Sequence, residues 1–425
     1  MRLLIKNGRV VDPASGTDET LDILIDKGKI VDLKAKIEST GPKTIDASRL
    51  VVAPGFIDMH VHLREPGQED KETIKTGSLA AAKGGFTSLC AMPNTEPPND
   101  NRGVTEYILS EAKKNAVVNI FPIASVSKGL AGEELTDMAD LVSMGAIAFS
   151  DDGRPVHNSH LLRRALEYSK FLKTLIIDHC EDKSLTEDGV MHEGHYSYLL
   201  GLKGIPASSE EIMVARDIIL AEKAEARIHI AHLSVKGAVQ LIKEAKKRKI
   251  QVTAEATPHH LVLSDSALES YDTNLKVNPP LRSVEDVEAL IEAIREGVVD
   301  TIATDHAPHT PEEKDVEFDK APFGIAGLET AVSLLLDKLV NKNVISLQKF
   351  IEMISTSPAR ILGLENKGKI TIGADADLTI LNLHKDSIVD VNSFKSKSRN
   401  NPFHNWKLKG APVMTIVGGK IVYPF

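Results

Sequence analysis

Two histidines separated by one residue, His60 and His62, lie near the end of a short apolar run in residues 55–64. On a β-strand the side chains alternate between the two faces, so both imidazoles point to the same side. Two imidazoles placed in this way can chelate one divalent ion, and imidazole suits zinc and similar metals. A histidine pair on an exposed strand is the simpler alternative. The metal site is favoured because a polar pair at the C-terminal end of a buried strand needs a reason.

Further acidic and imidazole side chains follow other short apolar runs of the chain. They are Asp151, Asp152, His179, His232 and Asp305. Any one of them alone is explained as a structural polar residue. Together they lie at the C-terminal ends of separate predicted strands, and in a barrel of parallel strands these ends converge on one mouth. Four histidines and two aspartates exceed the needs of one tetrahedral zinc, so the pattern predicts a binuclear site with a bridging carboxylate and a bridging water.

The middle of the chain alternates short apolar runs with segments of helical spacing. The apolar runs are residues 56–62, 86–92, 118–124, 146–150, 175–179, 227–232, 251–255 and 300–305. Helical patterns between them include residues 73–83, 133–144, 210–222 and 235–247. Eight strands separated by helices predict an α/β fold with a (β/α)8 TIM-like barrel at residues 53–365. A doubly wound open sheet is the competing fold, but no Gly-x-Gly-x-x-Gly follows a first strand.

Both ends of the chain are rich in strand and hairpin patterns. Residues 3–5 and 9–12 flank Asn7-Gly8, residues 22–26 and 29–33 flank Lys27-Gly28, and residues 413–417 and 420–423 flank Gly418-Gly419. Such dipeptides between apolar runs indicate tight turns. Short hairpins bury too little surface alone, and chain ends commonly lie close together. We therefore expect residues 1–52 and 366–425 to form one composite β-sandwich domain.

Composition and charge exclude several classes of function. The chain has 425 residues, with 42% hydrophobic and 26% charged residues, which is ordinary for a globular enzyme. A formal net charge of −9 argues against a nucleic-acid or anionic-membrane partner. No apolar run approaches about 20 residues, and the first residues lack a signal-peptide cleavage pattern. Cys90 and Cys180 are expected to be reduced thiols, so we expect a cytoplasmic protein.

The candidate residues lie within longer motifs, of which the longest is Asp58-Met59-His60-Val61-His62-Leu63-Arg64-Glu65-Pro66-Gly67. The others are residues 92–95, 151–153, 178–181, 277–280, 303–309 and 322–324. These motifs resemble those of the dihydroorotases, of the long bacterial type within the amidohydrolase superfamily. The resemblance spans nearly the whole chain, and it implies a barrel with a composite β-sandwich, in agreement with the pattern of elements.

The resemblance implies two zinc ions held by six side chains. The first ion would be bound by His60, His62 and Asp305, and the second by His179 and His232, with Asp152 between them. In many relatives a carboxylated lysine fills the bridging position, but no lysine stands at the end of the fourth predicted strand. His229 and His259, among other histidines, receive no role. Asp151 is expected to point away from the metals, because adjacent residues of an extended segment face opposite ways.

The resemblance also implies a substrate and a reaction. Arg64, Asn94 and His309 would bind the substrate carboxylate, and Asn278 with the backbone of Pro322, Phe323 and Gly324 would hold the ring amides. The reaction is the reversible cyclisation of N-carbamoyl-L-aspartate to L-dihydroorotate in pyrimidine biosynthesis. A bound metal lowers the pKa of water toward about 7, and Asp305 would take its proton and pass it to the departing amide nitrogen.

Three other functions agree with part of the pattern. A hydantoinase or allantoinase shares the fold and the chemistry, but its substrates lack the ring carboxylate that Arg64 would bind. A catalytically inactive scaffold subunit should have lost metal ligands, whereas every expected position is filled. A zinc-storage module needs no anion-binding residues beside the metals. We therefore expect a dihydroorotase, with a homodimer and an aspartate transcarbamoylase complex as its expected assemblies.

Overall fold

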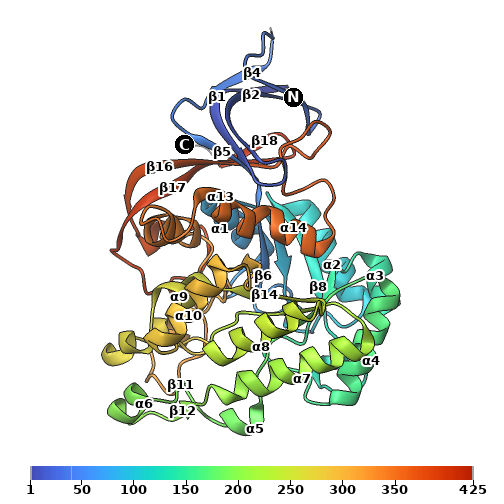
Figure 1. Cartoon of the computed structure of the whole chain (residues 1–425), viewed down its shortest axis with the longest axis vertical. Coiled ribbons are helices and arrows are strands. Elements are labelled where there is room, and N and C mark those ends of the chain that lie inside the picture. The colour runs from blue at the N-terminus through green and yellow to red at the C-terminus, as the bar shows by residue number, and fades with distance from the viewer. Residues whose placement is uncertain (1, 40, 424–425) are drawn as a thin grey trace.

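Eight parallel strands form the middle of the protein in the computed structural model, which describes residues 2–39 and 41–423 (Figure 1). In spatial order they are β6 (Phe56–Val61), β7 (Phe86–Ala91), β8 (Asn119–Ala124), β9 (Ala148–Phe149), β10 (Ile176–Asp178), β13 (Ile228–Ile230), β14 (Val252–Ala256) and β15 (Thr301–Ile302). The ring closes where Val61 pairs with His306 and the His62 amide donates to the His306 carbonyl at 2.9 Å. The predicted (β/α)8 barrel is confirmed.

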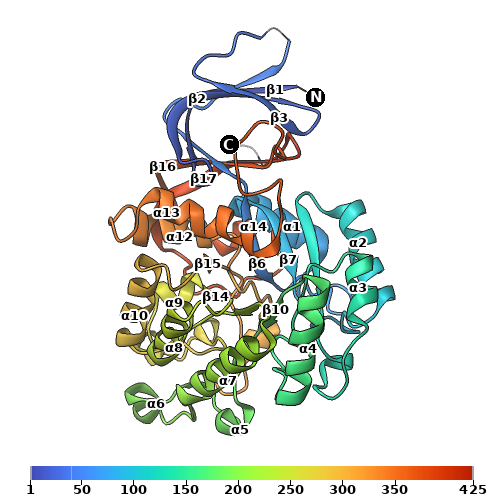
Figure 2. The same ribbon diagram turned by 45° about the vertical axis from the view of Figure 1, so that its right-hand side comes forward.

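Helices surround the strands of the barrel (Figure 2). They include α1 (Ile74–Gly84), α2 (Arg102–Asn115), α3 (Met138–Met144), α4 (Ser159–Leu172), α7 (Ser208–Ala224), α8 (Lys236–Lys247) and α10 (Val284–Arg295). Several begin at side chains that accept hydrogen bonds from the first free amides, such as Asn101 before α2 and Asn158 before α4. The apolar face of each helix packs on the strands, which fixes the strand ends that carry the polar residues.

Strands from both ends of the chain form a second sheet, which lies above the barrel in Figure 1. Its strands are β1 (Leu3–Asp12), β2 (Thr17–Asp26), β3 (Lys29–Lys34), β4 (Lys43–Asp46), β5 (Val51–Pro54), β16 (Leu378–Ile388), β17 (Lys407–Val417) and β18 (Lys420–Tyr423). The two ends meet where β5 pairs antiparallel with β16. The association of the termini is therefore observed, while the boundaries at residues 52 and 366 stay a prediction.

One predicted hairpin is wrong. The Asn7-Gly8 pair does not turn the chain but forms an irregularity within the continuous strand β1, where the register with β2 shifts between Ile5 and Gly8. Asn7 has φ of 60°, which asparagine tolerates, and its amide donates to the Asp22 carboxylate at 2.9 Å. A side chain at Gly8 would collide with Val52. The hairpins β2–β3 and β17–β18 are confirmed.

The two cysteines lie in the interior as free thiols. Cys90 is in β7 and Cys180 follows β10, and both are buried. Burial raises the pKa of each thiol well above its ordinary value, so both stay protonated and unreactive. Within residues 2–39 and 41–423, no helix combines the length and the apolar character that crossing a bilayer requires.

We predict that Phe56→Ala lowers the free energy of unfolding by about 3–5 kcal/mol, measured by urea denaturation. Phe56 is fully buried and packs edge-to-face on Phe86 at 6.4 Å and on Phe350 of α13 (Leu347–Ile351) at 5.8 Å. The matched control is Phe171→Ala in α4, because that ring is 80% exposed and its loss should cost less than about 0.5 kcal/mol. Equal losses in the two variants would contradict the prediction.

Candidate metal centre and active site

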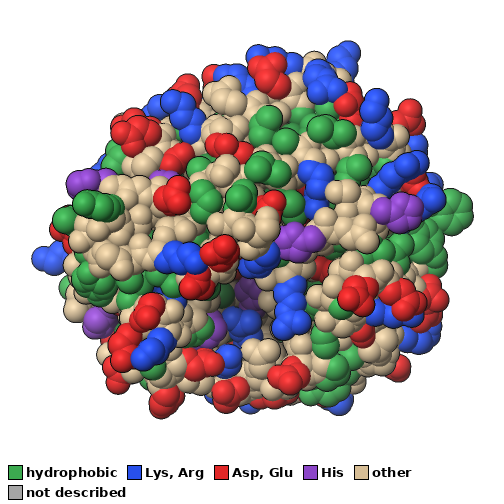
Figure 3. Space-filling view, turned by 90° about the horizontal axis from the view of Figure 1, so that it is seen from below, with side chains coloured by type: hydrophobic (Ala, Val, Ile, Leu, Met, Phe, Trp, Pro, Cys, Tyr) green, Lys and Arg blue, Asp and Glu red, His purple; other side chains and the backbone are tan. Residues whose placement is uncertain are grey.

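A cavity of about 610 Å³ opens at the C-terminal ends of the barrel strands. Viewed from the end opposite the terminal sheet, the surface is hollowed near its centre, with basic and histidine side chains in the hollow (Figure 3). The lining includes His62, Arg64, Asn94, Asp152, His179, His232, Asn278, Asp305, His309, Pro322, Phe323 and Gly324. The structure thus brings together the residues predicted from the sequence, and His60, which is fully buried, lies behind this surface.

Asp152 stands among the four histidines that the sequence singled out. Its Oδ1 lies 3.3 Å from His60 Nε2, 3.5 Å from His179 Nδ1 and 3.6 Å from His232 Nε2. Its Oδ2 lies 3.5 Å from His62 Nε2. Asp305 approaches the same group, with Oδ1 at 3.2 Å from His62 Nε2 and 3.6 Å from His60 Nε2. Six side chains from five strand ends therefore face a common centre.

These side chains fit a divalent metal. His60 Nε2 and Asp152 Oδ1 are buried and have no hydrogen-bond partner among the described residues. Because buried polar atoms in proteins are almost always paired, two unpaired ligand atoms that face each other fit the binding of a cation. Two overlapping groups of ligand atoms are close enough to hold an ion, and both include His60: one adds His62 and Asp305, and the other adds Asp152 and His232. Nitrogen and carboxylate donors in this combination suit zinc.

The electrostatics of the centre keep both aspartates charged. Burial alone would raise the pKa of Asp152, but the surrounding imidazoles, His60 foremost, hold it well below the ordinary value. Asp305 is shifted in the same direction, because its hydrogen bond to His62 and the charge of His60 outweigh the effect of burial on its pKa. Conversely, Asp152 and Glu255 raise the pKa of His60 well above its ordinary value despite burial. The centre therefore contains two negatively charged carboxylates, which favour the binding of a cation.

Three of the histidines are oriented by a partner behind the centre. His60 Nδ1 donates to Glu255 Oε1 at 2.9 Å, and His62 Nδ1 donates to Asn94 Oδ1 at 2.8 Å. His179 Nε2 donates to Glu181 Oε2 at 3.0 Å. Each bond places the proton on the outer nitrogen and leaves the lone pair of the inner nitrogen facing the centre. Asn94, predicted only as a substrate contact, is therefore also a support for a metal ligand.

Glu255 was missed by the sequence analysis, although it ends the seventh predicted strand. Besides its bond to His60, it accepts from the His232 amide at 3.3 Å and from His229 Nε2 at 3.1 Å. Burial would raise the pKa of Glu255, but its bonds to His229 and His60 lower it to about 2. The same signal that selected the other residues, a polar side chain at the end of a buried strand, could have found it.

Asp58 is a second missed residue, and it ties the first barrel strand to the last. Its Oδ1 accepts from the amides of His60 at 3.2 Å and Thr304 at 3.1 Å, and its Oδ2 accepts from Thr304 Oγ1 at 2.6 Å. Asp305 follows Thr304 directly, and its φ of 48° is unusual for a side chain of this kind. Asp58 thus fixes the strand ends that carry His60 and Asp305.

Asp151 points away from the centre, as expected. Its Oδ1 accepts from the amides of Val126 at 2.8 Å and Ser127 at 3.1 Å, which tie it to the loop after β8. Gly153, with φ of 76°, lets the chain turn directly after Asp152. Adjacent aspartates therefore serve different purposes, one in the centre and one in the loop that supports it.

Arg64 and His309 lie beside the centre and differ in the number of hydrogen bonds that they make to the protein. The half-buried Arg64 donates from Nε to the Pro308 carbonyl at 3.2 Å and makes no ion pair with any described residue. Burial lowers its pKa from the usual arginine value. His309 has both ring nitrogens occupied, with Nε2 at 2.9 Å from the Phe323 carbonyl and Nδ1 at 3.1 Å from Glu313. Arg64 is therefore the freer of the two for an anionic ligand.

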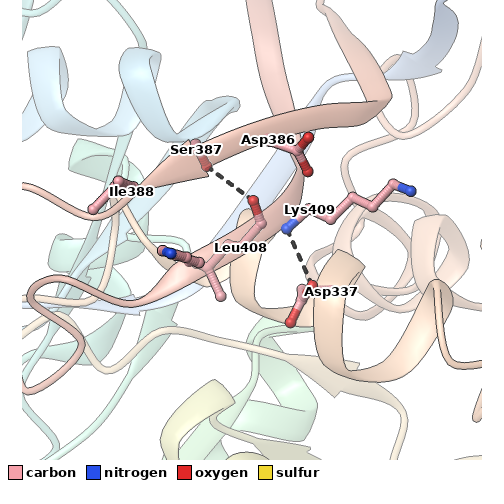
Figure 4. Close-up of a pocket in the computed structure, with 7 residues that line it drawn as sticks. Asp337, Asp386, Ser387, Ile388, Leu408 and Lys409 are labelled. Carbon is pink, nitrogen blue, oxygen red and sulfur yellow. Dashed lines mark hydrogen bonds between the residues drawn. The ribbon is translucent and has the colours of Figure 1, made fainter.

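A second cavity of about 430 Å³ lies on the terminal sheet, between the ends of β16 and β17. Figure 4 shows two hydrogen bonds within its lining: Ser387 Oγ donates to the Leu408 carbonyl, and the Lys409 amide donates to Asp337. No set of imidazoles or carboxylates converges there in the described part of the chain. We therefore assign the candidate active site to the cavity at the barrel mouth.

Comparison with known proteins gives consistent similarities over the whole chain. A dihydro-orotase-like family model matches residues 48–238, and an amidohydrolase family model matches residues 221–423. The chain is 54% identical to the dihydroorotase of Pelotomaculum thermopropionicum, over 99% of this chain and 98% of that protein. It is 50% identical to the dihydroorotase of Geobacter metallireducens, over 100% of both. The solved L-hydantoinase (dihydropyrimidinase) from Arthrobacter aurescens superposes with a TM-score of 0.91 at 27% identity, covering 99% of this chain and 96% of that one.

We predict that Asp152→Asn loses at least one bound metal ion per chain, measured by elemental analysis after dialysis, because the amide removes the negative charge that faces four imidazoles. Asp151→Asn is the matched control. It makes the same chemical change one residue earlier, in a side chain bonded to backbone amides, and should keep the metal content of the unaltered protein. Metal loss from both variants, or from neither, would show that Asp152 has no special place in the centre.

Proposed function

The chain belongs to the dihydroorotase family of cyclic amidohydrolases, and on this premise we propose that it interconverts N-carbamoyl-L-aspartate and L-dihydroorotate in de novo pyrimidine biosynthesis. The proposal is supported by the names of relatives about 50% identical over the whole chain. The fold alone does not select this substrate, because a hydantoinase has nearly the same structure. The selection depends on what the cavity can bind beside the metal centre.

The observation that carries the proposal is the unpaired guanidinium of Arg64. Arg64 is half-buried and has no counter-charge among the described residues, so its place in the cavity favours an anionic ligand. The planar fork of a guanidinium matches a carboxylate better than an ammonium does. Both dihydroorotate and N-carbamoyl-aspartate carry a carboxylate beside the reacting amide, whereas hydantoin and allantoin do not. Arg64 therefore favours the dihydroorotase reaction over the hydantoinase reaction.

The other predicted contacts complete the substrate site in this proposal. Asn94 has its amide nitrogen free while its oxygen accepts from His62, so it can donate to the carboxylate that Arg64 binds. His309 lies beside them. It would also bind the carboxylate when Nε2 exchanges its hydrogen bond to the Phe323 carbonyl for one to the substrate. Asn278 and the segment of Pro322, Phe323 and Gly324 line the cavity wall and would hold the ring amides.

Two zinc ions complete the proposed centre, with His60, His62 and Asp305 holding one and His179 and His232 the other. Asp152 would lie between them, where a carboxylated lysine stands in many relatives. A zinc pair supplies Lewis acidity, which activates water and polarises an amide carbonyl. The outer bonds of His60, His62 and His179 would hold their rings in the orientation that binding requires.

Asp305 is the proposed proton carrier of the reaction. In ring opening, the water oxygen bonds to the ring carbonyl carbon, the bond between that carbon and the ring nitrogen breaks, and the nitrogen gains a proton. Asp305 would take the proton from the attacking water and deliver it to the nitrogen. The lowered pKa of Asp305 leaves its carboxylate unprotonated at neutral pH, as a base requires. Ring closure follows the same steps in reverse.

We also propose a homodimer in solution. The support is a set of exposed apolar side chains on two helices, α6 (His195–Leu200) and α7: Tyr198, Leu199, Ile212 and Ile219. Sedimentation velocity of the purified chain tests the dimer, and a single monomer peak at micromolar concentration would reject it. A complex with an aspartate transcarbamoylase rests on the family resemblance alone.

The direct test of the function is turnover of dihydroorotate, hydantoin and allantoin by the purified protein, with zinc measured in the same sample. We expect ring opening of dihydroorotate and little activity on the other two. We further predict that Arg64→Met raises the KM for dihydroorotate by a factor that corresponds to roughly 2–5 kcal/mol, because a buried carboxylate loses its charged partner. Zinc content should not change.

Arg102→Met is the control for Arg64→Met, because Arg102 is an exposed arginine that pairs with Asp140 on the outer surface. Its KM should equal that of the unaltered protein. An unchanged KM in Arg64→Met would show that the guanidinium does not bind the carboxylate, and activity on hydantoin in the same protein would then favour a hydantoinase.

Replacing Asp305 by asparagine should lower kcat at least about 10²-fold, because the proton carrier is lost. Asp305 is also a proposed ligand, so kcat has to be compared at equal zinc content, after reconstitution and elemental analysis. A fully loaded Asp305→Asn protein with near-normal kcat would rule out the proton-carrier assignment.

A further inference from the structure

Two lysines, Lys276 and Lys314, are buried beside the substrate cavity, with relative exposures of 3% and 6%. Lys276 follows the short helix η3 (Thr273–Leu275), and Lys314 ends α11 (Pro311–Lys314). Neither ammonium forms an ion pair with a carboxylate in residues 2–39 or 41–423, and both are directed to backbone carbonyls. Lysine is rarely buried without a counter-charge, so this pair requires an explanation.

The Lys314 ammonium joins two loops of the cavity wall. It donates to the Thr273 carbonyl at 2.9 Å and to the Pro322 carbonyl at 2.7 Å. In return, Thr273 Oγ1 donates to the Lys314 carbonyl at 2.6 Å. The loop that begins at Thr273 and the loop that ends at Gly324 are therefore bonded to each other through one side chain.

Lys276 makes the second connection between the same loops. Its ammonium donates to the Asp319 carbonyl at 2.9 Å and lies over the rings of Phe323, at 4.8 Å from the centroid, and Phe318, at 5.6 Å. Its own carbonyl accepts from the Gly324 amide at 2.8 Å. Cations over aromatic faces and charged donors to carbonyls are among the stronger polar contacts in an interior.

These bonds hold the part of the wall that was assigned to the substrate ring. Pro322, Phe323 and Gly324 line the cavity, and Asn278 stands two residues after Lys276. Burial lowers the pKa of Lys314 to about 7 and that of Lys276 to about 8, so the fold keeps two ammonium groups here at a cost. A methionine would fill the same space without the desolvation of an ammonium group. The hydrogen bonds that the ammonium groups donate therefore explain why lysines stand at these two positions.

We propose that Lys276 and Lys314 are positioning residues that set the geometry of the substrate-ring wall by clamping the loop of residues 273–278 to the loop of residues 311–324. The inference rests on the proposed function, since it concerns the ring contacts of that same site. The lysines touch neither the metal ligands nor Asp305, so they act on substrate binding and not on the proton transfer. Loosening the clamp misplaces Asn278 and Phe323 together, because both loops are fixed by the same two side chains.

The test compares Lys314→Met and Lys276→Met with Lys320→Met. Lys320 lies in the same loop, but its side chain is exposed and pairs with Glu317. We expect the first two variants to raise the KM for dihydroorotate and for N-carbamoyl-aspartate at least about 10-fold, with kcat within about 3-fold of the unaltered protein and the same zinc content. Amide hydrogen exchange at residues 316–324 should become faster. Lys320→Met should match the unaltered protein in every respect.

An unchanged KM in folded Lys314→Met and Lys276→Met proteins would overturn the proposal, as would a fall in kcat equal to the rise in KM. If a methionine variant fails to fold, the glutamine variant of the same lysine replaces it, because the glutamine amide still donates but reaches less far. A KM above that of the unaltered protein then supports the clamp, and a normal KM with fast exchange of the loop rejects it. Failure of the proposed function would show in the unaltered protein, whereas failure of the clamp would show only in the variants.

Discussion

The negative charge of Asp152 among four imidazoles is the interaction on which the rest of the site depends. Its two oxygens face His60, His62, His179 and His232 at 3.3–3.6 Å, and all five side chains are buried. A bound cation would pair with the two buried carboxylates and with His60 Nε2 and Asp152 Oδ1, which have no hydrogen-bond partner among the described residues. A barrel satisfies this requirement well, because it delivers the ligands from separate strands that rigid helices hold in place.

The bonds behind the ligands show how the fold keeps such a group in order. Asp58 links the ends of the first and last strands, and Glu255 links His60, His229 and the backbone at His232. Each carboxylate accepts several bonds in a place where an unpaired charge would be costly. The precision of the centre therefore depends on residues that touch neither metal nor substrate.

The cationic side chains of the barrel mouth differ in the partners of their positive charges. The difference distinguishes cations that stabilise the fold from one that is placed to bind a ligand. Arg282 is fully enclosed and donates to Ser234 at 3.0 Å and to the Ile205 carbonyl at 3.1 Å, with Glu210 as its counter-charge at 3.5 Å. Lys276 and Lys314 are compensated by carbonyls and rings. Among the residues that the structure describes, Arg64 lines the cavity, donates one hydrogen bond to the Pro308 carbonyl and has no carboxylate partner.

The sequence by itself determined the type of fold and the residues that meet at the candidate metal centre. The eight strands, the position of His60 and His62 on one face, and the acidic or imidazole residues at four of the later strand ends are local patterns, because strand periodicity and the alternation with helices are encoded in neighbouring residues. The pairing of the two termini also followed from local hairpin patterns. Motif resemblance, rather than physical reasoning, supplied Arg64, Asn94 and His309.

Only the tertiary structure decided what depends on contacts between distant residues. Asn7-Gly8 has the local pattern of a hairpin turn, but the approach of Val52 and the carboxylate of Asp22 make it an irregularity in a continuous strand. Glu255 lies 195 residues from His60, and Lys314 lies 41 residues from Thr273, so no local pattern predicts their bonds. Local sequence specifies which elements form and which faces they present, whereas the partners of a buried charge are known only when the chain has closed around it.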